Sequence, residues 1–286
     1  MFQYTNYLAV GHFTHDVTSH GMIIGGAAAY SAITARNLGA SPRVVTSVGP
    51  DFNPHDPLLQ EVEIHPILSA STTIFDNQYD VQGHRTQMLL GVATPLMAEH
   101  IPEDWQTADI VYLCPVVNEV DISVVTCLNG SLVGATPQGW MRRWDADGRV
   151  LPRWWEEAEA FLTHVDILVM SEEDIAAYPG ELERYIALTP IVILTRGANG
   201  ALLFAEGREI DSRAYPTQEI DPTGAGDVFA TSFLLHYHRT GDPLAALDFA
   251  HCVASFSVEA EGTLGIPTYQ RVLERQQWDL KLRAGQ

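Results

Sequence analysis

In the second half of the chain, strand-like and helical segments alternate. Because two neighbouring parallel strands need a crossover connection, usually a helix, this order predicts an α/β fold with a mostly parallel sheet and helices on both faces. Ligands bind such sheets beyond the carboxyl ends of the strands, so the loops that follow the strands are the candidate site. Strand-like runs lie at 7–10, 44–48, 110–113, 131–135, 167–170 and 191–195, and helical segments at 27–38, 123–128, 154–163, 224–238 and 243–260.

Residues 63–92 have a different pattern. Short strand-like runs at 63–68, 72–75 and 87–90 are separated by polar breaks, and no helical period is visible. This pattern predicts a small β-sheet lid, to which residues near 12–24 also contribute. The 286 residues, 46% of them hydrophobic, fit one domain spanning 1–286 with this lid projecting from it.

The segment 221–227, with the sequence DPTGAGD, leads directly into an apolar helical stretch. The first amides of a helix have no intrahelical partner, and the helix dipole adds partial positive charge, so an anion can bind there. Asp227 places a carboxylate beside this predicted anion site. Such a carboxylate suits a general base that takes a proton from a hydroxyl attacking a phosphoryl group. The alternative is a turn capped by Asp221, with Asp227 favoured by the dipole.

Charge and composition exclude several classes of protein. Lys281 is the one lysine in the chain, so there is no Walker A loop, no strand lysine of a protein kinase and no Schiff-base lysine. The net charge is −20 without a basic stripe, which argues against nucleic acid as a partner. No run is apolar for long enough to cross a membrane. The three cysteines are widely spaced, so we expect a cytoplasmic protein without disulfides.

Two segments resemble the ribokinase, or PfkB-type, family of carbohydrate kinases. The first is GGAAAYSAITARNLGA at 25–40, and the second is DPTGAGDVFATSF at 221–233, followed by AHCVASFSVEAEG at 250–262. The order, the spacing and the chain length all fit this family. The resemblance implies a ribokinase-like fold and an enzyme that uses ATP and Mg²⁺ to phosphorylate a substrate hydroxyl.

The resemblance also implies roles for residues near the acceptor. Asp227 would be the catalytic base, and the amides of Gly224, Ala225 and Gly226 would hold the transferring phosphoryl group. Asp16 resembles the aspartate with which the family grips two substrate hydroxyls, a role that a carboxylate can fill by accepting two O–H donors. The backbone at Gly25 and Gly26 would approach the substrate closely.

On the donor side, the resemblance implies contacts with ATP and with metal ions. The family usually carries Asn-x-x-Glu where this chain has Ser171 and Asp174, and that motif holds magnesium-bound water; here Mg²⁺ would be held by Asp174 and water. Asp221 and Thr223 match a loop that holds K⁺ in some relatives. Residues that match the ATP loop and the adenine pocket are Thr195, Arg196, Gly197, Gly200 and His251.

The acceptor is predicted to be a neutral polyol. Ala27 and Tyr30 replace the lysine and asparagine of ribokinase, and the stretches 10–17, 25–30 and 138–145 resemble the inositol-kinase branch. Asn118, Glu119 and Gln138 could supply hydroxyl partners. A nucleoside kinase of the same fold, or a ribokinase-like protein that only binds ligand, remain alternatives. Some members of the family dimerise through the lid, so a homodimer is also an expectation.

Overall fold

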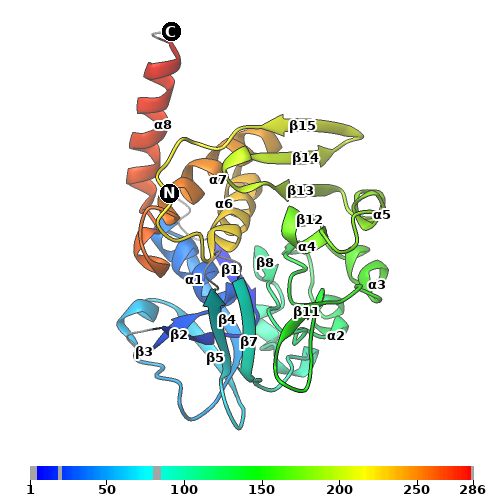
Figure 1. The fold of residues 1–286 in the computed structure, drawn as a ribbon. Coiled ribbons are helices and arrows are strands. Elements are labelled where there is room, and N and C mark those ends of the chain that lie inside the picture. Colours follow the sequence, from blue (N-terminus) through cyan, green and yellow to red (C-terminus); the bar gives the residue numbers. More distant parts are fainter. Residues whose placement is uncertain (1–4, 19–20, 80–84, 285–286) are drawn as a thin grey trace.

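The computed structural model describes residues 5–18, 21–79 and 85–284 (Figure 1). Its centre is a nine-stranded sheet in the order β15-β14-β13-β12-β9-β8-β1-β4-β5, parallel from β5 to β13, with β14 and β15 antiparallel. The prediction of a mostly parallel sheet is confirmed. The strands are β1 (Asn6–Val10), β4 (Ser41–Val48), β5 (Glu63–Leu68), β8 (Ile110–Leu113), β9 (Leu132–Ala135), β12 (Ile167–Ser171), β13 (Ile191–Thr195), β14 (Ala201–Ala205) and β15 (Arg208–Ser212).

Helices cover both faces of the sheet, because alternate residues of each strand point to opposite sides. In β1, Tyr7 and Ala9 pack with α1, α6 and α7, whereas Leu8 and Val10 belong to a second core that includes α2, α3 and α5. The helix α8 extends from the body at the C-terminal end (Figure 1). The helices are α1 (Ala27–Leu38), α2 (Ile122–Thr126), α3 (Ala158–Leu162), α4 (Glu172–Ile175), α5 (Glu181–Leu188), α6 (Ala225–Thr240), α7 (Pro243–Ser257) and α8 (Tyr269–Ala284).

The lid is a separate four-stranded sheet in the order β3-β2-β6-β7. It consists of β2 (Thr14–Thr18), β3 (Gly21–Gly25), β6 (Thr73–Tyr79) and β7 (Arg85–Gly91). The strands β2 and β6 pair in parallel, and the other pairs are antiparallel. Because β2 follows β1 directly and β6 follows β5, the lid lies at the carboxyl ends of the central strands. Residues 19–20 and 80–84 of the predicted lid lie outside the described residues.

The structure corrects three predicted segments. The run at 63–68, expected in the lid, forms β5 and pairs with β4 at the edge of the central sheet, where its Pro66 is tolerated. The segment 138–152, expected to be a loop, contains an antiparallel hairpin of β10 (Arg142–Trp144) and β11 (Val150–Pro152). The helix expected at 154–163 begins later, at Ala158, because Trp155 stacks on Trp140 with ring centroids 4.8 Å apart. Within the described ranges, no helix has the length and apolar character needed to span a bilayer.

Candidate active site

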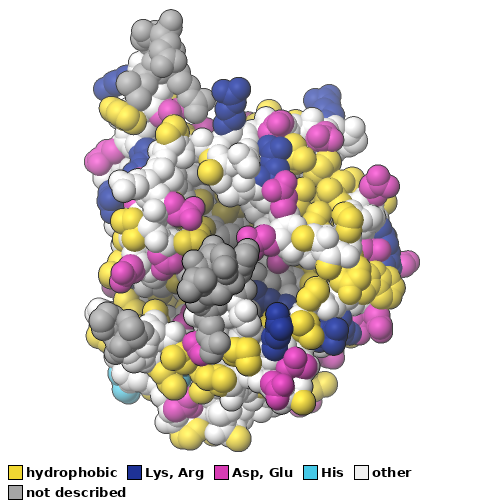
Figure 2. Space-filling model, in the orientation of Figure 1, with side chains coloured by type: hydrophobic (Ala, Val, Ile, Leu, Met, Phe, Trp, Pro, Cys, Tyr) yellow, Lys and Arg dark blue, Asp and Glu magenta, His cyan; other side chains and the backbone are white. Residues whose placement is uncertain are grey.

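A cavity of about 500 Å³ lies beyond the carboxyl ends of five neighbouring strands, β1, β8, β9, β12 and β13. Figure 2 shows a hollow near the middle of this face of the molecule, with acidic and basic side chains both at its margin. The lid contributes Asp16, Phe75, Asn77 and Gln87 to the cavity wall, and the start of α6 contributes residues 224–227. The loops that parallel strands bring to one edge therefore form a single site, as the sequence predicted.

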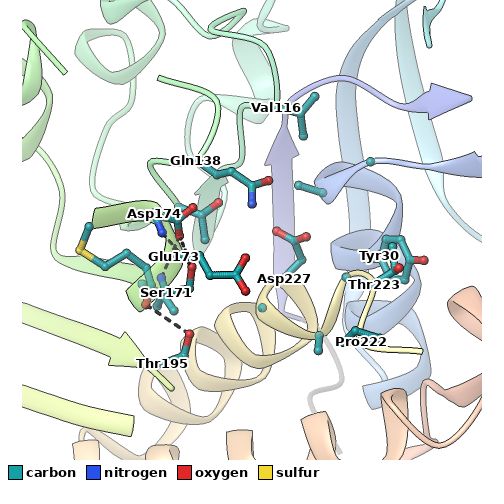
Figure 3. Close-up of a pocket in the computed structure, with 18 of the residues that line it drawn as sticks. Tyr30, Val116, Gln138, Ser171, Glu173, Asp174, Thr195, Pro222, Thr223 and Asp227 are labelled. Atoms are coloured by element: carbon teal, nitrogen blue, oxygen red, sulfur yellow. Dashed lines mark hydrogen bonds between the residues drawn. The ribbon is translucent and has the colours of Figure 1, made fainter. Parts of the chain in front are cut away.

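Asp227 lies in the first turn of α6, where its carboxylate meets the cavity. Gln138, Glu173 and Asp227 point into the same space (Figure 3). The pKa of Asp227 is raised to about 6, and burial is the largest cause. The hydrogen bond from Tyr112 lowers this pKa, the charge of Asp174 raises it, and the charge of Arg142 lowers it. A carboxylate with a raised pKa in a cleft is typical of a group that exchanges protons during catalysis.

The turn before α6 has the geometry of an anion site. Gly224 adopts φ +73°, a left-handed conformation that favours glycine, and caps the helix. The amide of Ala225 donates to the carbonyl of Pro222 (3.1 Å), so it is already bonded. In the described part of the chain, the amides of Gly224, Gly226 and Asp227 have no backbone acceptor. Of the three amides that the sequence predicted, those of Gly224 and Gly226 are therefore unpaired, and that of Ala225 is not.

At the lid end of the cavity, Asp16 lies on the strand β2. Its Oδ1 accepts a hydrogen bond from Thr14 Oγ1 (3.1 Å). Its Oδ2 lies so close to Gly25 that a Cβ there would come within 2.2 Å of it. Gly25 therefore leaves space for the carboxylate of Asp16. Gly26 and Gln138 line the cavity, as predicted.

The opposite end of the cavity is lined by residues at the ends of β12 and β13. Ser171 and Asp174 form a reciprocal capping box at the start of α4, in which the amide and the hydroxyl of Ser171 both donate to Asp174 Oδ2 (2.8 Å each). No cluster of three or more His, Cys, Asp or Glu side chains suited to a metal lies within the described ranges. Three acidic residues at this end, Glu172, Glu173 and Asp174, do line the cavity. This donor set fits Mg²⁺ that keeps most of its water and binds mainly to phosphates.

A second cavity of about 400 Å³ adjoins the first, and Thr195, Gly197, Ala225 and Gly226 line both. Its far wall contains the predicted residues Gly200 and His251 together with Tyr215, Phe229 and Val258. His251 Nε2 lies 2.8 Å from Ser212 Oγ, and burial lowers the pKa of His251 to about 4, so this imidazole is neutral. The cavity is a largely apolar slot, lined on its polar side by residues that include the neutral His251 and the acidic Glu219, and it lies next to the start of α6.

Arg196 and Thr223 also line the first cavity. Arg196 forms an ion pair with Asp211 of β15, which holds its guanidinium at the cavity margin. Asp221 lines neither cavity. Its two carboxylate oxygens accept from the amides of Thr223 (2.9 Å) and Gly262 (2.8 Å). Burial alone would raise the pKa of Asp221, but these hydrogen bonds hold that pKa below its usual value. Asp221 therefore ties the turn before α6 to the loop after α7.

The structure places Asn118 and Glu119 outside both cavities, against the prediction that they face the substrate. Glu119 is 2% exposed, and its carboxylate accepts from the backbone amides of His12 (2.9 Å), Val116 (2.9 Å) and Val117 (2.7 Å). Asn118 adopts φ +61° in the turn between them. Glu119 therefore stabilises this turn, since a buried carboxylate needs such donors.

Several wall residues were not predicted from the sequence. Phe75 and Asn77 lie two residues apart on β6 and therefore share one face of the lid. Gln87, on the neighbouring strand β7, donates from Nε2 to Asn77 Oδ1 (3.0 Å). Strand alternation would have found this face if the strands had been placed correctly. Other unpredicted residues include Thr14, Tyr30, Val116, Thr136, Arg142, Glu172 and Glu173 in the wall, and Tyr112 behind Asp227.

Comparisons with known proteins agree with this arrangement. A family model described as pfkB family carbohydrate kinase matches residues 95–268, more than half of the chain. A nucleoside kinase of Methanocaldococcus jannaschii is 24% identical over 270 residues, which cover 88% of this chain and 84% of that protein. An inositol 3-kinase of Oryza sativa subsp. japonica is 28% identical over 300 residues, which cover 92% of this chain and 70% of that protein.

Solved structures share the fold. A pyrophosphate-dependent kinase in the ribokinase family, complexed with a pyrophosphate analog and myo-inositol, superposes with a TM-score of 0.78 at 22% identity, covering 94% of this chain and 99% of that one. The nucleoside kinase of M. jannaschii gives a TM-score of 0.73 at 21% identity, covering 96% and 99%. The fold is therefore ribokinase-like, with a large, mostly parallel sheet and a small separate lid sheet.

Proposed function

The chain belongs to the pfkB family of carbohydrate kinases, phosphotransferases with a hydroxyl acceptor, and from that premise we propose that it phosphorylates a neutral sugar or cyclitol with ATP. The observation that carries this proposal is the position of Asp227. Asp227 lines one cavity together with the unpaired amides that begin α6 and the polar residues Asp16, Asn77, Gln87 and Gln138. A hydroxyl bound to that wall and a phosphoryl group bound to those amides would meet beside one base.

In this mechanism, Asp16 accepts two hydroxyl groups of the acceptor, and Asp227 accepts the proton of the hydroxyl that attacks. The amides of Gly226 and Asp227 donate to the oxygens of the transferring phosphoryl group, whose charge is spread over those oxygens in the transition state. Glu173 and Asp174 would hold Mg²⁺ through water, and that ion neutralises charge on the phosphates. The lid excludes water from the site.

ATP is the proposed donor because of the apolar slot next to the anion site. A base needs a flat apolar pocket with few polar groups, and the neutral His251 and the ring of Phe229 supply such walls. Pyrophosphate, the donor named for one structural neighbour, would leave this slot without an occupant. A donor comparison at saturating acceptor tests the choice: ATP should support turnover, and pyrophosphate should not.

A myo-inositol-like polyol is the favoured acceptor. The wall offers oxygen acceptors and amides at Asp16, Asn77, Gln87 and Gln138, which suit a ring carrying several hydroxyl groups. The rice inositol 3-kinase and the neighbour that was complexed with myo-inositol support this substrate class.

A nucleoside is the second candidate, since the relative from M. jannaschii is a nucleoside kinase. A nucleobase acceptor would need an exposed aromatic face on the lid. Phe75 is 4% exposed, and the guanidinium of Arg142 lies 5.9 Å from its ring centroid, so this ring is already covered. ADP release across inositols, pentoses, hexoses and nucleosides separates the candidates. Turnover with nucleosides alone would reject the polyol.

The lid also supports the expected homodimer. Met22 and Ile23 on β3 and Leu90 on β7 are 59%, 46% and 59% exposed. Apolar side chains exposed on a small sheet are typical of a surface that pairs with a second copy. Sedimentation velocity of wild-type protein and of a Met22→Lys, Leu90→Lys variant tests this surface: the wild type should be dimeric and the variant monomeric.

A further inference from the structure

Tyr112, the third residue of β8, is fully buried beneath the active-site cavity. Its hydroxyl donates to Asp227 Oδ1 at 2.9 Å. No other side chain in the described part of the chain donates to this carboxylate. The contact therefore joins the central sheet to the first turn of α6 at the proposed catalytic base.

Tyr112 makes a second hydrogen bond, and the two contacts together show which group donates in each. Tyr112 Oη also lies 2.9 Å from Thr136 Oγ1, at the end of β9. A tyrosine has one O–H group, and an ionised carboxylate accepts but does not donate. The proton of Tyr112 therefore points to Asp227, and Thr136 donates its own proton to Tyr112. Burial raises the pKa of Tyr112 well above its usual value, so the hydroxyl stays protonated throughout the range in which the enzyme would work.

We propose that Tyr112 is a positioning residue that holds Oδ1 of Asp227, with its proton directed by Thr136, so that Oδ2 faces the acceptor hydroxyl. This inference rests on the proposed function, in which Asp227 is the base. A general base must lie within hydrogen-bond reach of the proton that it takes, and a carboxylate fixed through one oxygen keeps the other in place. Tyr112 itself touches no substrate.

The hydrogen bond also stabilises the ionised form of Asp227. Removing it should therefore raise the pKa of Asp227 and leave fewer molecules with an active base at a given pH. The other groups that act on this carboxylate stay in place in such a variant. They are Arg142 from β10 and Asp174 from α4. Tyr7 from β1, Tyr30 from α1 and Cys114 after β8 also lie near this carboxylate, but burial raises the pKa of each, so they stay protonated and add no charge.

Tyr7 provides a matched control. It is also a fully buried tyrosine beside α6, on the strand next to β8. Its hydroxyl lies 2.8 Å from Ser31 Oγ and 3.0 Å from Thr231 Oγ1, and it does not bond to Asp227. Tyr7→Phe and Tyr112→Phe thus remove the same atom from similar surroundings, and only the second removes the hydrogen bond to the base.

The experiment measures the pKa of Asp227 by carbon-13 NMR titration of aspartate carboxyl groups, and the pH dependence of kcat, in wild type and both variants. In Tyr112→Phe, the pKa and the acid limb of kcat should move up by about one unit, and kcat on the high-pH plateau should fall about tenfold. The KM for ATP should stay within twofold. Tyr7→Phe should match wild type in each measurement, whatever its effect on thermal stability.

Values for Tyr112→Phe equal to those for Tyr7→Phe would overturn the inference. If Tyr112→Phe does not fold, Thr136→Val replaces it, because loss of the directing donor should move the same limb upward by a smaller amount. The NMR titration needs no turnover, so it tests the contact even if no acceptor is phosphorylated. Wild-type activity that persists in Asp227→Asn would reject the proposed function instead.

Discussion

The ring of Tyr30 lies directly against Gly224, so that a Cβ at Gly224 would come within 2.2 Å of Tyr30 Cδ1. Tyr30 belongs to α1, the helix that begins after the first glycine pair, and Gly224 caps α6, which carries Asp227. The two glycine motifs, about 200 residues apart in the sequence, therefore lie against each other at this contact. The contact holds the start of α6 against α1.

Gly224→Ala should lower kcat by about 100-fold, because a shift of about 1 Å at the anion site disturbs the alignment of the reacting groups. The variant should also lose about 1–3 kcal/mol of stability from its left-handed backbone. Gly241→Ala is the control, since Gly241 has φ +66° but nothing within 4 Å of a Cβ. Thermal unfolding should show the backbone cost in both variants and a larger loss of stability in Gly224→Ala, which also carries the clash with Tyr30. Steady-state kinetics should show a loss of kcat in Gly224→Ala alone. Equal kcat values in the two variants would contradict the importance of the Tyr30 contact.

Asp16→Asn should raise the KM for the acceptor by about 10- to 100-fold, the loss expected for hydrogen bonds to a charged group. The KM for ATP should change by less than twofold. Gly25→Ala should act in the same direction, because its Cβ would displace the carboxylate of Asp16. Asp76→Asn, on the neighbouring lid strand and outside the cavity wall, is the control. An unchanged acceptor KM in Asp16→Asn would remove Asp16 from the substrate site.

Glu119→Gln should destabilise the protein by about 1–3 kcal/mol, because Glu119 accepts from three buried backbone amides and a neutral amide does so less well. The KM for the acceptor should not change. Asn118→Gly should be neutral or slightly stabilising at φ +61°. Chemical denaturation together with acceptor kinetics distinguishes this structural role from substrate binding. A large rise in KM without loss of stability would restore the role that the sequence suggested.

Asp227→Asn should be more stable than wild type at pH 8, by on the order of 1–3 kcal/mol. The folded-state pKa of about 6 lies above the usual aspartate value of 3.8, so ionisation of this carboxyl as the pH rises through 6 destabilises the folded chain. The difference should vanish below about pH 4, where the carboxyl is protonated in both states.

Asp221→Asn is the control of opposite sign. The pKa of Asp221 is lowered in the folded chain, so its ionised form contributes stability above the unfolded pKa and loses it as the pH falls through the folded pKa. This variant should therefore be less stable than wild type at pH 8. Urea denaturation at pH 8 and pH 4 measures both differences, and the same sign for the two variants at pH 8 would contradict the account.

The alternation of strands and helices was enough to predict the parallel sheet and the loops that form the site. These strands are easy to recognise because each is buried on both faces and therefore forms a continuous apolar run. Prediction failed for β5, whose half-exposed edge position gives the same short pattern as a lid strand. It failed also for the hairpin β10–β11, whose three-residue strands are too short to show a period.

Among site residues, those in local motifs were predicted, and those that depend on long-range contacts were not. Residues 224–227 form their site from one helix start, so their spacing is informative. The link from Tyr112 to Asp227 spans 115 positions and depends on the order of strands in the sheet. Glu119 was misassigned because a carboxylate after a strand end suits a ligand and a backbone turn equally well. Contacts within the turn decide between these roles.

The most direct test of the central claim is the rate of ADP release by wild type and Asp227→Asn with ATP and myo-inositol, with ATP binding measured on the same samples. The wild type should release one ADP for each phosphorylated polyol. The variant should bind ATP with an affinity within about threefold of wild type and lose at least about 100-fold in kcat. Turnover by Asp227→Asn within tenfold of the wild-type rate would contradict the assignment of Asp227 as the base.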